Sequence, residues 1–182
     1  APLAPIYHKL IIEELGLKLP SCIINIGGVS NITYWDGELL MGFDTGPGNG
    51  LMDTYIRSIS NDYYDKDGLI ASKGNVKNKL IDEFLNHPFF KKVPPKSLDK
   101  YSFHNFYNQI LQQNYSANDT MATLLEFTVK TIEIAFNFFP KKVEYLVITG
   151  GGFNNVYLMK CLEERLDLEI VDQNGLEINF NY

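Results

Sequence analysis

The chain contains little cysteine and little histidine. Its 182 residues include two cysteines and three histidines, and neither Cys22 nor Cys161 has further ligands at the spacing of a metal site, so we expect no directly bound metal. Both cysteines lie in apolar segments, which predicts buried thiols and a cytoplasmic location, where thiols stay reduced. The histidines are scattered along the chain, and we expect each at the surface or at a helix end.

Long apolar runs and long basic runs are also absent from the sequence. A membrane span needs roughly 18 consecutive apolar residues, so we expect no membrane partner. The chain has 16 lysines and arginines against 22 acidic residues, a formal net charge of -6, which argues against a nucleic-acid partner. Hydrophobic residues make up 45% of the chain, which suits one globular domain or at most two small ones.

The two ends of the chain are also informative. It begins Ala1-Pro2-Leu3, without a methionine or a signal-like segment, and it stops at Asn181-Tyr182 in the middle of a pattern. Neither end has the form of a targeting segment. We therefore expect a piece of a longer protein.

Short strands dominate the first third of the chain. Apolar spacing over residues 6–15 predicts a helix. Asp36-Gly37 lies between two β-branched runs and is a strong signal for a hairpin with a type I′ turn. Residues 44–48 are predicted as a loop that leads into a helix beginning at Asn49. Three consecutive antiparallel strands are expected at residues 22–26, 31–35 and 39–43.

Helices dominate the rest of the chain. Residues 61–118 are predicted as a mostly helical insertion, with helical patches at residues 76–85 and 103–111. A long amphipathic helix then begins at a cap, Asn118 or Asp119, and runs to about residue 139. The remaining elements are a strand at residues 145–149, a helix at 155–166 and a strand at 168–171.

The strongest candidate site is the segment of residues 42–50. Asp44 stands there at the carboxyl end of a strand, followed by glycines and the start of a helix. Glycines let backbone amides approach a phosphate, the helix N-terminus adds partial positive charge, and a carboxylate can accept a proton. From local chemistry alone, the alternative is a tight strand-to-helix turn in which Asn49 caps the helix.

A second strand-glycine-helix junction occupies residues 147–155. Its three glycines, Gly150, Gly151 and Gly152, remove side chains from a surface that a flat ligand or a neighbouring backbone can then approach. Two such junctions suit a nucleotide held between two half-sites. A packing contact between helix and strand explains the second junction equally well.

A third candidate is the glycine turn of residues 25–31. Asn25 and Asn31 flank Gly27 and Gly28, and their amides are able to hydrogen-bond a polyhydroxylated ligand. Turns that connect strands prefer the same residues for local backbone bonding, so both readings stay open.

A lysine follows two prolines in residues 94–97. This placement either puts Lys96 into a cleft as a cation or makes an ordinary charged loop. The sequence alone does not separate the two.

These segments together resemble the anhydro-N-acetylmuramic acid kinases, members of the actin-like, sugar kinase and Hsp70 ATPase superfamily. The matches occur in chain order and cover almost all of this chain, but only about half of a complete family member. The order of strands and helices also agrees with the second lobe of that superfamily. The matching segments are residues 1–5, 25–28 with 31–33, 43–49, 94–97, 119–124 and 150–155.

The resemblance implies an α/β fold, the lobe of an actin-like ATPase (ribonuclease H-like). Such a lobe has a mixed sheet of three antiparallel strands plus parallel strands, with helices on both faces. Residues 1–182 would be the carboxyl-side lobe, with the helical insertion at about residues 61–118. The amino-terminal lobe and the final helix would be absent.

The resemblance also implies an activity and a set of site residues. The family uses ATP, Mg²⁺ and water to open the 1,6-anhydro ring and phosphorylate the sugar at O6, which gives N-acetylmuramic acid 6-phosphate in cell-wall recycling. Asp44 would be the catalytic base. The nucleotide and its phosphates would meet Thr45, Gly46, Gly48, Asn49, Gly150, Gly151 and Gly152, and the sugar would meet Asn25, Gly27, Gly28 and Asn31.

The chain departs from the family in two ways. After Ser97 it has Leu98-Asp99-Lys100 where the family usually has Thr-Gly-Arg, and it contains no Gly-Thr-Met-Ser-Gly-Thr-Ser-Leu-Asp-Gly phosphate loop. We therefore expect the chain to be inactive alone, and to form a homodimer or to pair with a separately encoded amino-terminal lobe. The alternatives are a catalytically dead fragment or assembly module with a kinase-lobe fold, and a superfamily member acting on another sugar or an acyl group.

Overall fold

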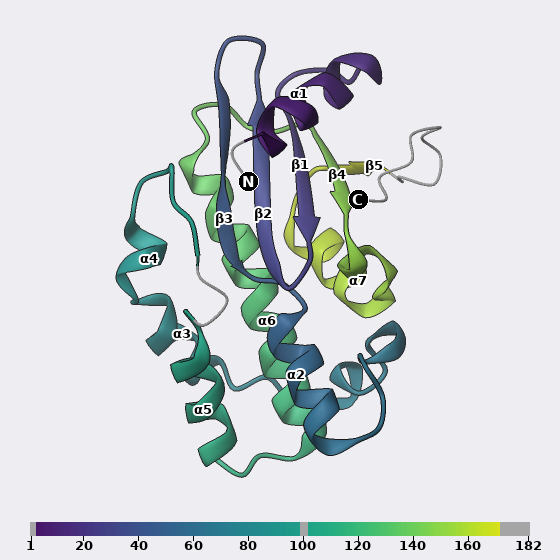
Figure 1. The fold of residues 1–182 in the computed structure, drawn as a ribbon, viewed down its shortest axis with the longest axis vertical. Helices are drawn as coiled ribbons and strands as arrows, with labels where there is room; N and C mark the ends of the chain where they lie inside the picture. Colours follow the sequence, from purple (N-terminus) through teal and green to yellow (C-terminus); the bar gives the residue numbers. More distant parts are fainter. Residues whose placement is uncertain (1–2, 99–101, 172–182) are drawn as a thin grey trace.

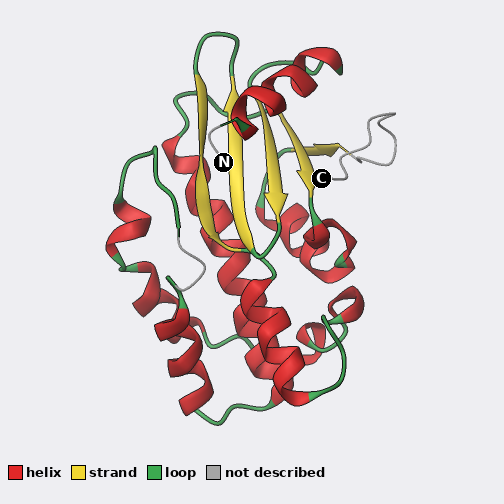
Figure 2. Ribbon diagram, in the orientation of Figure 1, coloured by secondary structure: helices red, strands yellow, loops and turns green. Residues whose placement is uncertain are grey.

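A five-stranded mixed sheet organises the upper half of the molecule (Figures 1 and 2). The structure is a computed structural model and describes residues 3–98 and 102–171. The strand order is β3-β2-β1-β4-β5. Strands β1, β2 and β3 are antiparallel neighbours, whereas β4 pairs with β1 and β5 pairs with β4 in parallel. The strands are β1 (Ser21–Ile26), β2 (Val29–Trp35), β3 (Leu40–Pro47), β4 (Tyr145–Thr149) and β5 (Glu169–Val171).

Helices cover both faces of this sheet, as predicted. Helix α1 (Ala4–Glu14) lies across one face (Figure 1), where Ile11 and Ile12 pack against a cluster that includes Ile23 of β1. Helices α6 (Ala117–Ala135) and α7 (Val156–Arg165) lie behind the other face. Because alternate strand residues point to opposite faces, β1 contributes Ile24 to the larger core on the α6 side.

The lower half of the molecule is helical (Figure 2). Within its described residues, the segment 61–118 folds into short helices, and α6 runs from the sheet down into them (Figure 1). Phe127 of α6 is fully buried there and contacts the rings of Phe90, Phe103 and Phe106. The helices of this half are α2 (Gly50–Ile59), η1 (Lys66–Gly68), η2 (Ala71–Lys73), α3 (Asn78–Leu85), α4 (Pro88–Lys91) and α5 (His104–Gln112).

The turn between β2 and β3 differs from its prediction. Asp36-Gly37 does connect β2 to β3, but Trp35 pairs with Leu40, so the loop has four residues rather than the two of a type I′ turn. Gly37 has φ +96°, and the Asp36 carboxylate accepts hydrogen bonds from the backbone N–H groups of Glu38 and Leu39 at 3.0 and 2.8 Å. The loop thus has one left-handed residue instead of the two of a type I′ turn, and the Asp36 carboxylate stabilises it through local backbone bonds.

The start of α6 also differs from its prediction. Neither Asn118 nor Asp119 caps the helix; the cap is Ser116, whose hydroxyl accepts the Asp119 N–H at 3.1 Å. Asp119 lies in the first turn, where it accepts the Asn75 N–H at 2.8 Å and pairs with the Lys77 ammonium at 2.7 Å. The acid that looked like a cap therefore anchors the insertion to α6.

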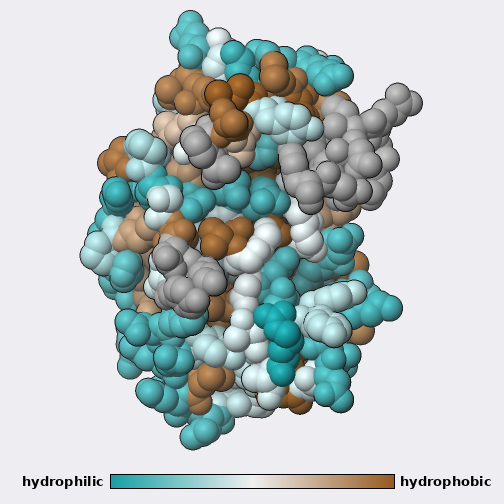
Figure 3. Space-filling model, in the orientation of Figure 1, coloured by the Kyte–Doolittle hydropathy of each residue, from teal (hydrophilic) through white to brown (hydrophobic). Residues whose placement is uncertain are grey.

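The outer side of α1 carries exposed apolar side chains. Leu3, Ile6 and Leu10 are more than half exposed, and Figure 3 shows hydrophobic atoms gathered at the top of the view, over this helix. The inward side is occupied by Ile11 and Ile12. In residues 3–98 and 102–171, no helix combines the length and the apolarity that crossing a membrane requires.

Candidate active site

Three polar side chains form one row across β1, β2 and β3. Asn25 pairs with Asn31, and Asn31 pairs with Asp44. Paired residues in antiparallel strands project from the same face of the sheet, and all three line one cavity of about 950 Å³. The sheet thus brings the predicted acid together with the two amides that were predicted as sugar contacts.

This cavity, which we call the Asp44 cavity, is walled by α1 and by residues 92–97. Pro5 lies close to β3 because Gly42 has no side chain; a Cβ at Gly42 would collide with the Pro5 ring. From the other wall, Lys92 and Ser97 reach the cavity. A small residue in β3 therefore lets the helix start approach the acid.

Asp44 lies inside β3 and not in a loop, which corrects the prediction for residues 44–48. Its N–H donates to the Lys96 carbonyl at 3.0 Å, and its Oδ2 accepts the Leu98 N–H at 2.7 Å. Residues 96–98 therefore run along the outer edge of β3 and cover it beside the acid. The carboxylate is held in a fixed orientation at the wall of a cavity, as a general base requires.

His8 is buried in the same wall, which corrects its prediction as a surface or helix-end residue. Its side chain is 3% exposed, lines the Asp44 cavity, and has Nδ1 2.8 Å from the Thr33 hydroxyl. Burial lowers the pKa of His8 to about 4, so the imidazole is neutral at pH 7. His87, by contrast, is a helix-end residue that accepts the Phe89 N–H at the start of α4.

Thr45 is turned away from the cavity by a bulge. The register between β2 and β3 shifts between Ser30 and Asn31, which leaves Thr45 as the extra residue on β3. Its side chain is buried and its hydroxyl donates to the Ser30 carbonyl at 3.2 Å. A bulge re-aims the chain, and here it directs the chain from Asp44 toward α2. A contact of Thr45 with phosphate stays a prediction.

The glycines after Asp44 allow a close approach of two loops. The N–H groups of Gly48 and Gly50 donate to the Gly28 carbonyl at 3.1 Å, and the Asn49 N–H donates to the Gly27 carbonyl at 2.7 Å. A Cβ at Gly48 would collide with the Gly27 carbonyl. These three amides are used within the chain, so the predicted phosphate role of Gly48 does not rest on its N–H.

Gly46 has a different neighbour. A Cβ there would collide with the Thr131 side chain of α6. The next turn of that helix holds the same loop, because the Thr128 hydroxyl donates to the Gly48 carbonyl at 3.0 Å. Helix α6 therefore fixes the loop that follows the acid, and the phosphate role predicted for Gly46 stays a prediction.

Two of the three glycines at the second junction pack against the end of β1. Gly150 has φ +81°, and a Cβ there would collide with the Asn25 side chain. A Cβ at Gly152 would collide with the Ile26 side chain. Gly151 differs, because a Cβ there would meet only the Asn49 amide, at an ordinary contact distance of 3.5 Å. Packing therefore explains Gly150 and Gly152 but leaves Gly151 open to a ligand.

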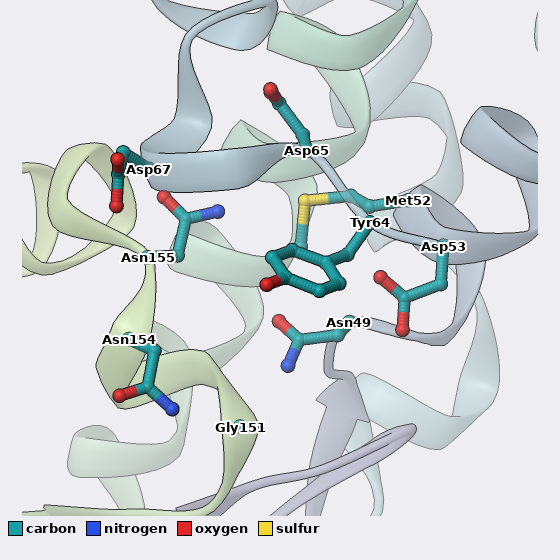
Figure 4. Close-up of a pocket in the computed structure, with 9 residues that line it drawn as sticks. All are labelled: Asn49, Met52, Asp53, Tyr64, Asp65, Asp67, Gly151, Asn154 and Asn155. Atoms are coloured by element: carbon teal, nitrogen blue, oxygen red, sulfur yellow. The ribbon is translucent and has the colours of Figure 1, made fainter. Parts of the chain in front are cut away.

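Gly151 lines a second, smaller cavity of about 300 Å³, which we call the Gly151 cavity (Figure 4). The alternative in which the Asn49 side chain caps α2 is wrong: Asn49 occupies the cap position, but its amide donates to the Ile26 carbonyl at 3.4 Å and lines this cavity. Burial raises the pKa of Asp53 above its usual range, and Arg57 opposes the shift. The other lining residues are Met52, Tyr64, Asp65, Asp67, Asn154 and Asn155.

Sequence reasoning missed most of the Gly151 cavity. Asp53, Tyr64 and Asp65 lie in α2 and the loop after it, far in sequence from Gly151, and no spacing links them. Asp65 shapes the loop by accepting the N–H groups of Ile70 and Ala71, both at 2.9 Å. The sequence offers only one local signal there, the acid Asp67 directly before Gly68.

The described residues contain no cluster of potential metal ligands. Among the residues that the structure describes, no three His, Cys, Asp or Glu side chains form a group able to hold a metal ion. Magnesium in phosphoryl-transfer sites is usually held by one or two carboxylates together with substrate phosphates and water. A magnesium ion held mainly by the phosphates of ATP and by water would need no such group of side chains.

A family model described as anhydro-N-acetylmuramic acid kinase matches residues 1–181. Curated proteins of that name are similar to most of the chain. One from Rhodopseudomonas palustris is 41% identical over 167 residues, which is 91% of this chain and 44% of the relative. The one from Zymomonas mobilis is 36% identical over 181 residues, which is 98% of this chain and 48% of the relative. The chain thus spans about half the length of the curated relatives it matches.

Two solved structures share the fold. An activator of 2-hydroxyisocaproyl-CoA dehydratase from Clostridium difficile, with bound ADPNP, has a TM-score of 0.52 and 15% identity, and covers 84% of this chain and 53% of its own. Component A of (R)-2-hydroxyglutaryl-CoA dehydratase from Acidaminococcus fermentans has a TM-score of 0.50 and 18% identity. The match covers 82% of this chain and 53% of that chain. At such identities the likeness concerns the fold alone.

Proposed function

The chain belongs to the anhydro-N-acetylmuramic acid kinase family, and from this premise we propose that it is the half of the enzyme that carries the catalytic base, Asp44. Its fold is that of an actin-like ATPase lobe, as the resemblance implied. The enzyme would act in the cytoplasm during cell-wall recycling, where the two free thiols of this chain stay reduced.

The proposed reaction couples ring opening to phosphoryl transfer. Water attacks the anomeric carbon of 1,6-anhydro-N-acetylmuramic acid and gives its proton to Asp44. The bond between that carbon and O6 breaks, O6 takes the γ-phosphoryl group of ATP, and the bond between that group and ADP breaks. The products are N-acetylmuramic acid 6-phosphate and ADP. Magnesium, when bound to the phosphates, neutralises the charge that builds up on them.

The row of Asn25, Asn31 and Asp44 is the observation that carries this proposal. A sugar has to be oriented with its anomeric carbon toward the base, and two amides beside the acid offer both donors and acceptors to hydroxyl groups. The Asp44 cavity, at about 950 Å³, has the size of a small-molecule site. Sugar contacts by Gly27 and Gly28 are less well supported, because their carbonyls already accept N–H groups of residues 48–50.

The nucleotide fits the Gly151 cavity. Gly151 has no side chain of its own and only the Asn49 amide lies near the position of its missing Cβ, so a flat base or ribose can approach the backbone there; the amides of Asn49 and Asn154 lie in the lining. Asn25 lies between the two cavities, because it lines the first and lies so close to Gly150, the residue before Gly151, that a Cβ at Gly150 would collide with its side chain. We assign the sugar to one cavity and ATP to the other, on the two sides of the glycine junctions.

The isolated chain should have little or no activity. Its sequence lacks the glycine-threonine-serine phosphate loop of the family, which we expect to close over the phosphates and exclude water from them. A purified 182-residue chain should form no sugar phosphate above the background of a blank. Turnover by the chain alone at the rate of an ordinary sugar kinase would contradict this expectation.

The direct test uses an enzyme of the relatives' full length whose carboxyl-side half is this chain. Incubation with ATP and 1,6-anhydro-N-acetylmuramic acid should produce ADP and N-acetylmuramic acid 6-phosphate in equal amounts, measured by a coupled ADP assay and by mass spectrometry of the sugar. A sugar that is phosphorylated with its anhydro ring intact would refute the role of water. No turnover by that enzyme would favour the alternative, an assembly module with a kinase-lobe fold.

A further inference from the structure

Lys96 is a buried lysine without a carboxylate partner in the described part of the chain. Its side chain is 6% exposed, and its ammonium donates to the Phe89 carbonyl at 3.2 Å. Within residues 3–98 and 102–171, its ammonium has no carboxylate within 4.0 Å. Burying a charge is costly unless other groups replace water around it.

Aromatic rings take the place of water. The Lys96 ammonium lies 4.3 Å from the ring centre of Phe138, 4.6 Å from that of Phe89 and 5.6 Å from that of Phe43. A cation within about 6 Å of a ring centre is attracted by the negative face of the ring. Burial still lowers the pKa of Lys96 to about 8, so the ammonium is charged at pH 7.

The three rings belong to three different elements. Phe43 is in β3, Phe89 is in α4, and Phe138 is in η3 (Phe136–Phe138), the turn that ends α6. A single side chain therefore joins the edge of the sheet to the insertion and to the end of the longest helix. An ordinary charged loop would place its lysine in water and would make none of these contacts.

The same residue is next to the proposed base. The Lys96 carbonyl accepts the Asp44 N–H at 3.0 Å, and two residues later the Leu98 N–H donates to Asp44 Oδ2 at 2.7 Å. Phe43, which contacts the Lys96 ammonium, directly precedes Asp44. The segment that orients the carboxylate is therefore the one that the buried ammonium anchors.

We propose that Lys96 is a positioning residue for Asp44: its ammonium, inserted among Phe43, Phe89 and Phe138, holds residues 96–98 against β3 so that the Leu98 amide orients the carboxylate. The catalytic part of this inference rests on the proposed function. The anchoring part does not, because it concerns hydrogen bonds within the chain. Lys96 need not touch the substrate to act in this way.

The test exploits the space that the Lys96 side chain fills among the three rings. Lys96→Ala removes four atoms, Cγ, Cδ, Cε and Nζ, and n-propylammonium has the same four heavy atoms and the same charge. The readout is the Leu98 amide in the intact protein, followed by ¹⁵N NMR and by hydrogen exchange. Lys96→Ala should shift this resonance and reduce its protection at least about tenfold. Propylammonium should restore both, whereas 1-propanol, which has the same size but no charge, should not.

A matched variant controls for the loss of any lysine. Lys91→Met changes an exposed lysine of α4 that lines neither cavity, and it should leave the Leu98 amide unchanged. If Lys96→Ala does not fold, Phe138→Leu, which removes the nearest ring, takes its place. This variant should likewise shift the Leu98 amide resonance and reduce its protection from hydrogen exchange. A folded Lys96→Ala or Phe138→Leu protein with an unchanged Leu98 amide would overturn the proposal, as would equal rescue by 1-propanol.

Activity separates the two proposals. In the full-length enzyme, Lys96→Ala should lower kcat about 10- to 100-fold, because a misplaced catalytic group costs rate, with KM for either substrate changed less than about threefold. Propylammonium should recover much of the kcat. If the wild-type enzyme is inactive but Lys96→Ala gives the expected NMR result, the proposed function is refuted and the anchoring role of Lys96 is supported. An active Lys96→Ala enzyme with wild-type kcat would refute the positioning role alone.

Discussion

The two cavities differ in what surrounds them. The Asp44 cavity is made of side chains that three strands place in one row, with an acid oriented by the Leu98 amide. The Gly151 cavity is lined mainly by side chains of α2, of the loop after it and of residues 154–155, and beside it the two glycine junctions are held together by close packing at Gly48, Gly150 and Gly152. Substitution of Asp44 should therefore change chemistry, and substitution of the packed glycines Gly48, Gly150 and Gly152 should change folding.

The largest expected effect concerns Asp44. Asp44→Asn keeps the size of the side chain and its acceptor for the Leu98 amide but removes the proton acceptor. General-base catalysis is typically worth about 10²- to 10⁴-fold, so kcat of the full-length enzyme should fall by that factor while its affinity for ATP and its melting temperature change little. Steady-state kinetics and calorimetry measure these quantities.

The control for this substitution is Asp62→Asn, which removes an exposed carboxylate after α2 that lines neither cavity. It should leave kcat unchanged. If Asp44→Asn instead retained turnover and lowered the melting temperature, Asp44 would belong with the glycines as a folding residue, and the comparison between the two cavities would break down.

The second effect concerns Gly48. A Cβ there would meet the Gly27 carbonyl, and a backbone oxygen that holds the Asn49 N–H cannot move aside without losing that bond. Gly48→Ala should therefore lower the free energy of unfolding by about 3 kcal/mol, at the upper end of the usual cost of overpacking. Urea denaturation followed by circular dichroism measures it.

Gly28 provides the matched control. It belongs to the same turn, but a Cβ there would meet nothing within 4 Å, so Gly28→Ala should change the free energy of unfolding by no more than about 0.5 kcal/mol. Equal destabilisation by the two substitutions would show that the turn resists any side chain, and that the contact seen at Gly48 is not the cause.

Much of this comparison could be predicted from the sequence, and some of it could not. Asp44 and the two glycine junctions stand out because an acid and clustered glycines follow apolar runs, and those patterns are local. The helical insertion was also predictable as helical. The hydrogen bond from Leu98 to Asp44 spans 54 residues, and only the pairing of a loop with a strand edge creates it.

The mistakes have physical causes as well. Asp119 looked like a helix cap because acids are frequent caps, but its carboxylate is used by Asn75 and Lys77 across the insertion. His8 looked like a surface residue because a lone histidine has no sequence partner, and its partner Thr33 lies on β2, 25 residues away. In both cases a long-range contact overrode a local preference.

The third effect is a dependence of stability on pH at the Asp44 cavity. The pKa of His8 is about 4 in the folded chain against about 6.5 when unfolded. Between these values the unfolded state binds more protons, so the free energy of unfolding falls as the pH falls. His8 alone should account for a loss of about 2 kcal/mol between pH 7 and pH 5.

Carboxylates titrate in the same range, so the wild type has to be compared with His8→Asn, whose amide can still bond the Thr33 hydroxyl. The difference between the free energies of unfolding of the wild type and of His8→Asn should change by about 2 kcal/mol from pH 7 to pH 5, because the wild type loses more stability. A difference that is flat with pH would mean that His8 is as well solvated in the folded chain as in the unfolded one.

The smallest effect is expected at Gly151, the glycine that packing does not explain. A Cβ there would meet only the Asn49 amide at 3.5 Å, so Gly151→Ala should fold with nearly wild-type stability. Its methyl group would nevertheless project into the surface where we place the nucleotide. A crowding cost of about 1 kcal/mol corresponds to roughly fivefold weaker ATP binding, measurable by isothermal titration calorimetry on the full-length enzyme, whereas KM for the sugar should not change. If Gly151→Ala instead weakened sugar binding and left ATP binding unchanged, our assignment of the two ligands to the two cavities would have to be reversed, because Gly151 would then face the sugar.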